Sequence, residues 1–322
     1  QLWVVTAREE ENGRLLGIAP LTLRQRVQSG WLPYRELVFL GSNEAAPDHL
    51  DFIIHQDASP MVLEALTQHV WANRKQWDIL FLDSVTPSST AVAQLQSYTS
   101  ARWQQVGELV SPSMLLPESW DIYWRQLSKN MRRNIKRYDR KLARMGDACY
   151  IQVTDAAELP EVLTNLRQMR QAIREESTFR DSRMEPFQQQ VATQFLHNGW
   201  LCCYRLQING TDISLTYNFC YDHKTYYYMT GYAQKWSDYG PGRQIVAYTI
   251  RRCIENEMYE FDFLRGNETY KYSWLAQAQI TLRVKIAGSP RGKFLMGARW
   301  IKSHLVNQVS QKSSSDESTP SL

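Results

Sequence analysis

The chain of 322 residues has few of the residues that build disulfide frameworks or metal centres. Its five cysteines are odd in number and show no Cys-x-x-Cys spacing. They are Cys149, Cys202, Cys203, Cys220 and Cys253. Its histidines likewise lack the spacing of zinc ligands. We therefore expect reduced, mostly buried cysteines, no metal and a cytoplasmic protein, with peripheral contact to a membrane as an alternative.

Long apolar runs are also missing. No run approaches the roughly 20 apolar residues that a membrane-spanning helix needs, and no secretory signal precedes the first expected strand. Because the sequence begins at Gln1 inside that strand, we expect the natural N-terminus to lie upstream. The net charge of +4 is mild, so charge matters locally. The 43% of hydrophobic residues supports a sizeable core in one large or two ordinary domains.

The sequence does contain one order of elements that occurs twice. Alternating apolar runs predict strands, and an apolar period near 3.6 predicts helices. The first succession is strands 2–8, 15–23 and 36–40, helix 60–73 and strand 77–85. The second is strands 200–206, 213–221 and 226–232, helix 242–257 and strand 259–264. An Asn-Gly turn joins the first two strands of each, at Asn12-Gly13 and Asn209-Gly210.

We interpret the two successions as diverged copies of one α/β unit, although hairpins with Asn-Gly turns also recur by chance. The expected domains are a first, incomplete unit over residues 1–117 and a second unit over residues 118–307. The stretch 308–322 is rich in serine and poor in apolar residues, which predicts a disordered tail.

A glycine-rich loop separates strand 226–232 from the helix that follows it. Gly240-Pro241-Gly242 would let the backbone approach a phosphate, and the first N–H groups of the helix would face its negative charge. An ordinary strand-to-helix turn explains the same residues equally well. The corresponding stretch of the first copy, residues 45–49, has no such glycines. We therefore expect the ligand site in the second copy.

Between the copies, residues 120–145 predict one strongly amphipathic helix. Its apolar stripe consists of Leu127, Met131, Ile135, Tyr138, Leu142 and Met145. Its opposite face gathers Lys129, Arg132, Arg133, Lys136, Arg140 and Arg144. A solvated face over a core stripe accounts for this pattern. A surface for an anionic ligand, for tRNA or for an anionic membrane, formed by residues 129–144, accounts for it as well.

Four motifs together resemble a known family. They are SKNMRRNIKRYDRKL, TDISLTYNFCYDHKTYYYMTGY, DYGPGR and FDFLRGNETYKYSW. In combination they resemble the CelD-type branch of the GNAT acyltransferase superfamily, which is associated with bacterial cellulose and exopolysaccharide synthesis and is similar to the Fem-type aminoacyltransferases. The resemblance implies an α/β tandem GNAT fold with two mixed sheets flanked by helices, its first unit truncated at the N-terminus.

The same resemblance implies acyl transfer from acyl-CoA. In this family the donor lies in a V-shaped split between two parallel strands, here 226–232 and 259–264, with its pyrophosphate on the following loop. The position that usually begins the phosphate-binding motif with Arg or Gln holds Ser237. The implied donor-binding residues are Tyr232, Tyr239, Gly240, Gly242, Arg243 and Gln244.

Catalysis of direct transfer needs a base for the acceptor's proton and a donor for the developing oxyanion. Asp262, between Phe261 and Phe263, is the candidate base; a buried Asp that hydrogen-bonds the neighbouring loop is the alternative. The resemblance gives Tyr270 and Lys271 a role in stabilising charge, whereas a loop that packs on the sheet would explain them structurally. Candidate substrate-binding residues are Arg265, Lys129 and Arg133.

The predicted function is therefore that of a GNAT-type acyltransferase, class EC 2.3. It would move an acyl group, in the first place acetyl from acetyl-CoA, to an amine or hydroxyl of a cell-envelope or polysaccharide precursor. One alternative is aminoacyl transfer from a charged tRNA, whose backbone the basic helix would contact. Another is a catalytically inactive GNAT-fold binding module of a polysaccharide synthase complex.

Overall fold

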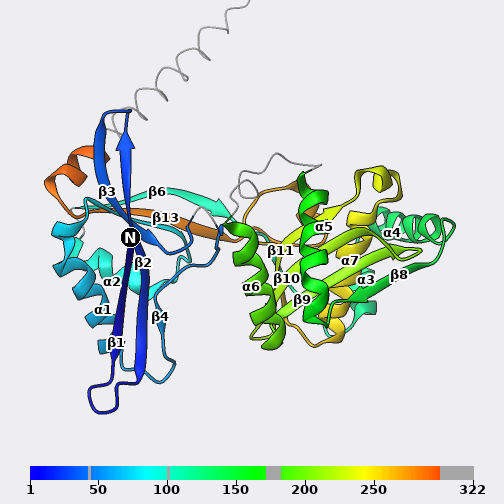
Figure 1. Cartoon of the computed structure of the whole chain (residues 1–322), viewed down its shortest axis with the longest axis horizontal. Helices are drawn as coiled ribbons and strands as arrows, with labels where there is room; N and C mark the ends of the chain where they lie inside the picture. The colour runs from blue at the N-terminus through cyan, green and yellow to red at the C-terminus, as the bar shows by residue number, and fades with distance from the viewer. Residues whose placement is uncertain (43–44, 100–101, 172–182, 298–322) are drawn as a thin grey trace, which may run out of the picture. The chain divides into compact units, whose positions relative to one another are not determined.

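The computed structural model describes residues 1–42, 45–99, 102–171 and 183–297 (Figure 1). The described chain forms two units, residues 1–109 together with 280–297, and residues 110–279. This division differs from the expected one, because the strand at residue 280 pairs into the sheet of the first unit. The tail expected over 308–322 lies outside the described residues. No described helix is long and apolar enough to span a bilayer.

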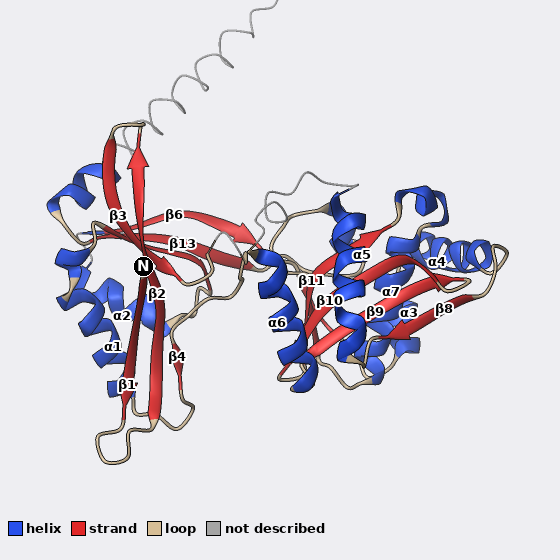
Figure 2. Ribbon diagram, viewed as in Figure 1, coloured by secondary structure: helices blue, strands red, loops and turns tan. Residues whose placement is uncertain are grey.

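The first unit is one mixed sheet with strand order β1-β2-β3-β5-β13-β6 and β4 beside β2 (Figure 2). Its strands are β1 (Leu2–Arg8), β2 (Leu15–Gln28), β3 (Leu32–Phe39), β4 (Ile53–Ile54), β5 (Ile79–Val85), β6 (Trp103–Val110) and β13 (Ile280–Ala287). Its helices include α1 (Pro60–Ala72) and α2 (Thr90–Thr99), and residues 290–297 are also helical. Alternate residues of β3, such as Leu37 and Phe39, bury against Leu66 and Val70 of α1.

The second unit is a mixed sheet with strand order β7-β12-β11-β10-β9-β8. Its strands are β7 (Ser113–Leu115), β8 (Ala148–Gln152), β9 (Leu201–Ile208), β10 (Thr211–Tyr221), β11 (Lys224–Tyr232) and β12 (Glu260–Asp262). Its helices are α3 (Trp120–Gln126), α4 (Lys129–Leu142), α5 (Leu159–Gln171), α6 (Met184–His197), α7 (Pro241–Glu255) and α8 (Thr269–Tyr272). Helices α5 and α6 cover one face of the sheet, and α3, α4 and α7 cover the other.

The two sheets confirm the predicted repeat. In each, a hairpin is followed by a third strand, a helix and a fourth strand that pairs in parallel with the third. The parallel pairs are β3 with β5, beginning at Glu36 opposite Ile79, and β11 with β12, beginning at Lys224 opposite Glu260. The predicted α/β class with mixed sheets is therefore correct.

The predicted single helix over residues 120–145 is wrong, because the chain forms two helices, α3 and α4. Leu127 is extended, and the hydroxyl of Ser128 accepts a hydrogen bond from the Met131 N–H at 3.1 Å. A serine that caps a new helix end ends the previous helix just before it. The predicted apolar stripe is nevertheless buried at Met131, Ile135 and Leu142.

The prediction that every cysteine is reduced is also wrong, because Cys202 and Cys220 form a disulfide. Cys202 of β9 pairs with Asn218 of β10, which places Cys220 one diagonal step away on the same face, with 6.2 Å between the Cα atoms. Cys203 points to the opposite face, as its position next to Cys202 predicted. Cys149, Cys203 and Cys253 are free thiols.

A buried arginine ties α5 to the sheet of the second unit. Arg205 of β9 donates to Asp212 of β10 at 2.9 Å, and its other nitrogens reach Glu158 at 2.9 Å and Glu161 at 3.0 Å. Its side chain is only 10% exposed, so these carboxylates replace the water that the guanidinium gives up. This network fixes the start of α5, the helix that covers β11.

We predict that Arg205→Leu lowers the free energy of unfolding by about 3–5 kcal/mol, because it leaves the buried Asp212 without its cation. Urea denaturation of the whole chain measures this loss. The matched control is Arg251→Leu, which removes an exposed ion pair with Glu255 and should change stability by about 0.5 kcal/mol or less. Equal effects of the two substitutions would contradict a structural role for Arg205.

Candidate active site

The site begins where the parallel strands β11 and β12 separate. They pair over three positions, from Lys224 opposite Glu260 to Tyr226 opposite Asp262. The pairing with β11 ends there. On the other edge, the Phe263 N–H still donates to the Pro112 carbonyl at 2.9 Å, and Leu264 then adopts a φ of 57°. Strand β11 continues to Tyr232 without β12 beside it. The split that the resemblance implied is thus present in the second unit.

A β-bulge and a cation shape the open edge of β11. Tyr227 and Tyr228 lie opposite the single residue Asn218, which shifts the pairing with β10. Beyond the bulge, the Thr230 carbonyl accepts a hydrogen bond from Nη1 of Arg170 of α5 at 3.1 Å. Helix α5 can approach so closely because a Cβ at position 231 would lie 2.9 Å from Met169 Cβ, and the residue there is glycine. Arg170 is a site residue that the sequence analysis missed.

The glycine loop between β11 and α7 is tightly packed. Gly240 adopts a left-handed φ of 63°, and a Cβ on it would lie 2.7 Å from the Tyr138 ring. A Cβ on Gly242 would lie 3.2 Å from the Tyr232 ring. Pro241 occupies the first turn of α7, and no side chain caps that turn. The partial positive charge of the helix N-terminus therefore faces the loop.

Three cations gather around Tyr138 at this helix end. The guanidinium carbons of Arg137 and Arg243 lie 4.7 and 5.6 Å from the centre of the Tyr138 ring. Nζ of Lys141 lies 5.9 Å from the same centre and donates to the Asp238 carbonyl at 3.1 Å. We call Arg137, Lys141 and Arg243 the cation cluster. Of the three, the sequence predicted only Arg243, although the other two flank Tyr138 along α4.

The other predicted donor-binding residues divide into two groups. Tyr232 and Tyr239 lie at the loop, where Tyr239 packs on Trp236 with 5.3 Å between ring centres. The amide of Gln244 is buried and donates to the Ile135 carbonyl at 2.7 Å, so it joins α7 to α4.

Two of the predicted substrate-binding residues lie away from the cation cluster. Lys129 is the first residue of α4, and Arg133 donates to Asn130 at 3.1 Å in the first turn. A rise of 1.5 Å per residue puts Lys129 roughly 12 Å from Arg137 along the helix.

Asp262 and Tyr226 face the other side of the sheet. Tyr227 and Phe261 pack in the core beneath α7, so their neighbours Tyr226 and Asp262 point to the opposite face. Asp262 is buried, and its Oδ1 accepts the Leu264 N–H at 2.7 Å, as the alternative interpretation proposed. Burial raises the pKa of the Tyr226 phenol, and the charge of Asp262 adds to this effect. The split therefore connects the cation cluster on one face with these two side chains on the other.

Lys271 is buried beneath the loop that follows β12. Its Nζ donates to the carbonyls of Leu264, Arg265 and Gly266 at 3.0, 2.9 and 3.0 Å, and lies 3.0 Å from Glu268. Three backbone acceptors match the three hydrogens of an ammonium group. This geometry supports a role in holding the loop, in addition to the predicted role in charge stabilisation.

The neighbouring aromatic residues differ in burial. Tyr270 is 43% exposed, and its ring lies 6.3 Å from that of Phe263. Trp274 is buried in the core beneath α7, where its carbonyl accepts the Tyr123 hydroxyl at 2.8 Å. Arg265 lies on the loop that Lys271 holds, at the end of the split. The structure thus places Asp262, Arg265, Tyr270 and Lys271 on one short segment.

Comparison with known proteins agrees with this geometry. Residues 129–272 match the model described as "Acetyltransferase (GNAT) domain". This range contains α4, the split, the glycine loop and Lys271. No curated protein matches the chain in sequence. The match to a GNAT acetyltransferase domain therefore lies within the second unit.

Several solved structures share the fold across both units. The crystal structure of FemX is 11% identical, covers 90% of this chain and 89% of its own, and gives a TM-score of 0.59. L-PGS from Bacillus licheniformis is 10% identical, with 89% and 86% covered and a TM-score of 0.53. The C-terminal domain of a putative lysylphosphatidylglycerol synthetase from Agrobacterium fabrum is 10% identical, with 92% and 88% covered and a TM-score of 0.51. These likenesses show the fold and confirm the predicted tandem GNAT class; the CelD-type branch stays a prediction.

We predict that Lys271→Met lowers the free energy of unfolding by about 3 kcal/mol, because three backbone carbonyls lose their donor. Urea denaturation measures the change. The control is Lys129→Met, an exposed lysine on the first turn of α4, which should leave stability within about 0.5 kcal/mol of the unsubstituted chain. Unchanged stability of Lys271→Met would show that the ammonium does not hold the loop.

Proposed function

We propose that the second unit binds an acyl-CoA thioester, in the first place acetyl-CoA, and transfers its acyl group to an amine or hydroxyl. The observation that carries this proposal is the separation of β11 and β12 after Tyr226 and Asp262, next to the uncapped N-terminus of α7. A strand with an open edge can bind an extended chain that carries amides, such as pantetheine. A helix N-terminus beside it can bind phosphate.

The residues around the loop fit such a donor. The cation cluster supplies three positive charges from two helices, beside a glycine where a Cβ would collide with Tyr138. Phosphate oxygens prefer this combination of fixed cations and helix dipole. The cluster therefore compensates for Ser237, which stands where the family's motif usually has Arg or Gln.

The opposite face supplies the groups for the acceptor. The amine or hydroxyl would attack the thioester carbonyl while Asp262 takes its proton. The carbon–sulfur bond would then break, and coenzyme A would leave as the thiol after its thiolate takes up a proton. The hydrogen bond from Leu264 fixes the orientation of this carboxylate. Tyr270 and Arg265 would contact the acceptor, which we propose to be a cell-envelope or polysaccharide precursor. Lys271 would hold the loop that presents them.

Aminoacyl transfer from a charged tRNA is the second candidate function. It is favoured by the likeness of the fold to FemX, to L-PGS and to a putative lysylphosphatidylglycerol synthetase, whose name specifies an aminoacylated lipid as product. The basic residues of α4, among them Lys129 and Arg133, would then contact the nucleic-acid backbone or an anionic membrane. A GNAT-fold binding module without catalysis is the third candidate.

We predict that acetyl-CoA raises the unfolding temperature of the chain. A ligand at 100 times its Kd adds about 2.7 kcal/mol to stability, a shift that thermal unfolding detects easily. Gly242→Val should abolish the shift, because even a Cβ at this position meets Tyr232 at 3.2 Å. The matched control is Gly297→Ala, since a Cβ there meets nothing within 4 Å, its φ is not in the left-handed region, and it lies outside the second unit.

Absence of any shift at millimolar acetyl-CoA, in a chain that unfolds cooperatively, would exclude this donor. Binding of charged tRNA that weakens steeply with salt would then favour aminoacyl transfer. Failure of both ligands would favour the binding module.

Two double variants that lose the same net charge test the cation cluster. Replacing both Arg137 and Lys141 by Ala should weaken acetyl-CoA binding by about 10- to 100-fold, because each ion contact to phosphate contributes about 1 kcal/mol or more. Replacing both Arg140 and Arg144 removes the same charge from exposed positions of the same segment and should change binding less than threefold. Isothermal titration calorimetry measures both constants. Equal losses in the two double variants would show that only net charge matters.

A further inference from the structure

The first unit carries a two-stranded arm, formed by the end of β2 and the beginning of β3. We define the β2–β3 arm as residues 24–35. Its strands pair in register as far as Gln28 opposite Leu32. Strand β1 pairs with β2 no further than Thr22, and β5 pairs with β3 only from Glu36 onward. Within the described chain, no other strand extends either edge of the arm, which continues past the neighbouring strands (Figure 2).

The end of the arm is apolar and exposed. Trp31 is 72% exposed and Val27 is 59% exposed. The turn between them is fixed, because Ser29 and Gly30 both have positive φ values, 54° and 79°, and the Trp31 N–H donates to the Gln28 carbonyl at 3.3 Å. A tight turn therefore presents an indole to solvent at the extremity of a ribbon. A two-stranded ribbon gains little stability by itself, so a partner would stabilise it further.

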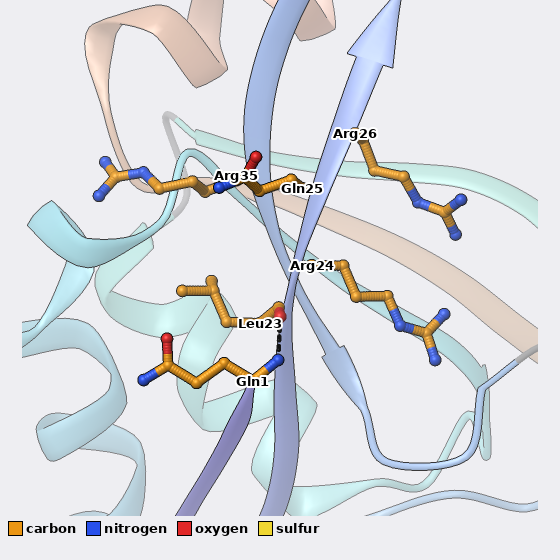
Figure 3. A pocket seen from close by; sticks show the side chains of 6 residues that line it. All are labelled: Gln1, Leu23, Arg24, Gln25, Arg26 and Arg35. Atoms are coloured by element: carbon orange, nitrogen blue, oxygen red, sulfur yellow. Dashed lines mark hydrogen bonds between the residues drawn. The ribbon is translucent and has the colours of Figure 1, made fainter.

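Positive charge lies behind this apolar end. Residues 24–36 contain three arginines and one glutamate. Arg26 pairs with that glutamate, Glu36, at 3.3 Å, Arg35 pairs with Asp78 at 3.6 Å, and Arg24 donates to the Ser42 carbonyl at 2.6 Å. A cavity of about 630 Å³ at the base of the arm is lined by Gln1, Leu23, Arg24, Gln25, Arg26 and Arg35. Figure 3 shows Arg24 and Arg26 on one side of β2 and Arg35 on the other, so the three guanidinium groups do not converge on a small ligand. They surround the stem of the arm instead.

We propose that the β2–β3 arm docks on the surface of an anionic phospholipid bilayer. Tryptophan prefers the interface between hydrocarbon and headgroups, where its ring is apolar and its N–H is hydrated. The arginines of the stem lie further back along the two strands than Trp31, so they would lie among the anionic headgroups. Because they project from both sides of the stem, they can meet a planar layer of negative charge. The proposal is independent of the acyl-transfer proposal, since its test measures lipid binding alone.

The arm is less suited to pairing with another protein strand. Pro33 removes one backbone donor from the edge of β3, and arginines along β2 discourage edge-to-edge pairing. The face that carries Val27 also carries Gln25 and Arg35, so no continuous apolar strip reaches the core. The arm has an apolar tip and a cationic stem. This order matches the hydrocarbon and anionic headgroup layers of a bilayer, whereas an apolar groove in a protein would match only the tip.

The experiment is flotation of the whole chain with vesicles of phosphatidylcholine alone or of an equimolar mixture with phosphatidylglycerol. We expect binding to the mixed vesicles only, and at least tenfold weaker binding for Trp31→Ser. Arg24→Gln should weaken binding roughly fivefold, the contribution of one cation near an anionic surface. The matched control, Met61→Ser, changes a side chain of α1 that is 74% exposed and should leave binding unchanged.

Three outcomes would overturn the proposal. They are equal binding to both kinds of vesicle, equal binding by Trp31→Ser and the unsubstituted chain, and a dimer in solution that Trp31→Ser disrupts. Far-ultraviolet circular dichroism and thermal unfolding of each variant establish that the first unit is intact. Vesicle binding that survives Trp31→Ser but disappears when Arg137 and Lys141 are replaced would assign the membrane contact to α4 instead.

Discussion

The geometry of the second unit depends on how early β12 stops pairing with β11. Three residue pairs hold the strands together, and the chain then continues beside residues 110–112, with Leu264 in a left-handed conformation. Both halves of the proposed site follow from this. The edge of β11 is left for a ligand, and the segment from Asp262 to Lys271 is brought across the end of the split. Lys271 stabilises the turn by donating to three successive carbonyls.

The contact between α4 and α7 is a second constraint on the geometry of the proposed site. The buried Gln244 amide donates to the Ile135 carbonyl, and Gly240 lets the Tyr138 ring lie against the loop. These contacts place Arg137 and Lys141 beside the helix N-terminus. In isolation, the basic face of α4 would only contact solvent. Through its contacts with α7, it contributes specific charges to the N-terminus of that helix.

Local patterns predicted much of the fold. The Asn-Gly turns, the alternating strands and the helix after Gly240 all occur where they were expected. The errors concern features set by distant residues. Ser128 caps a new helix, α4, within a sequence whose amphipathic pattern is unbroken. Cys202 lies close enough to Cys220 to form a disulfide only because of the register of β9 with β10. Arg170 and Lys141 act on carbonyls far away in sequence, so no spacing could reveal them. The grouping of Asp262, Tyr270 and Lys271 within one short segment, in contrast, was readable from one motif.

The place of β13 has a consequence for the order of assembly during synthesis. This strand follows the whole second unit in the chain, yet it lies between β5 and β6 of the first sheet. The second unit, residues 110–279, is contiguous and can form as soon as it leaves the ribosome. The first unit must wait with two open strand edges until Ala287 has been made. The half of the protein that is translated first is therefore the half that is completed last.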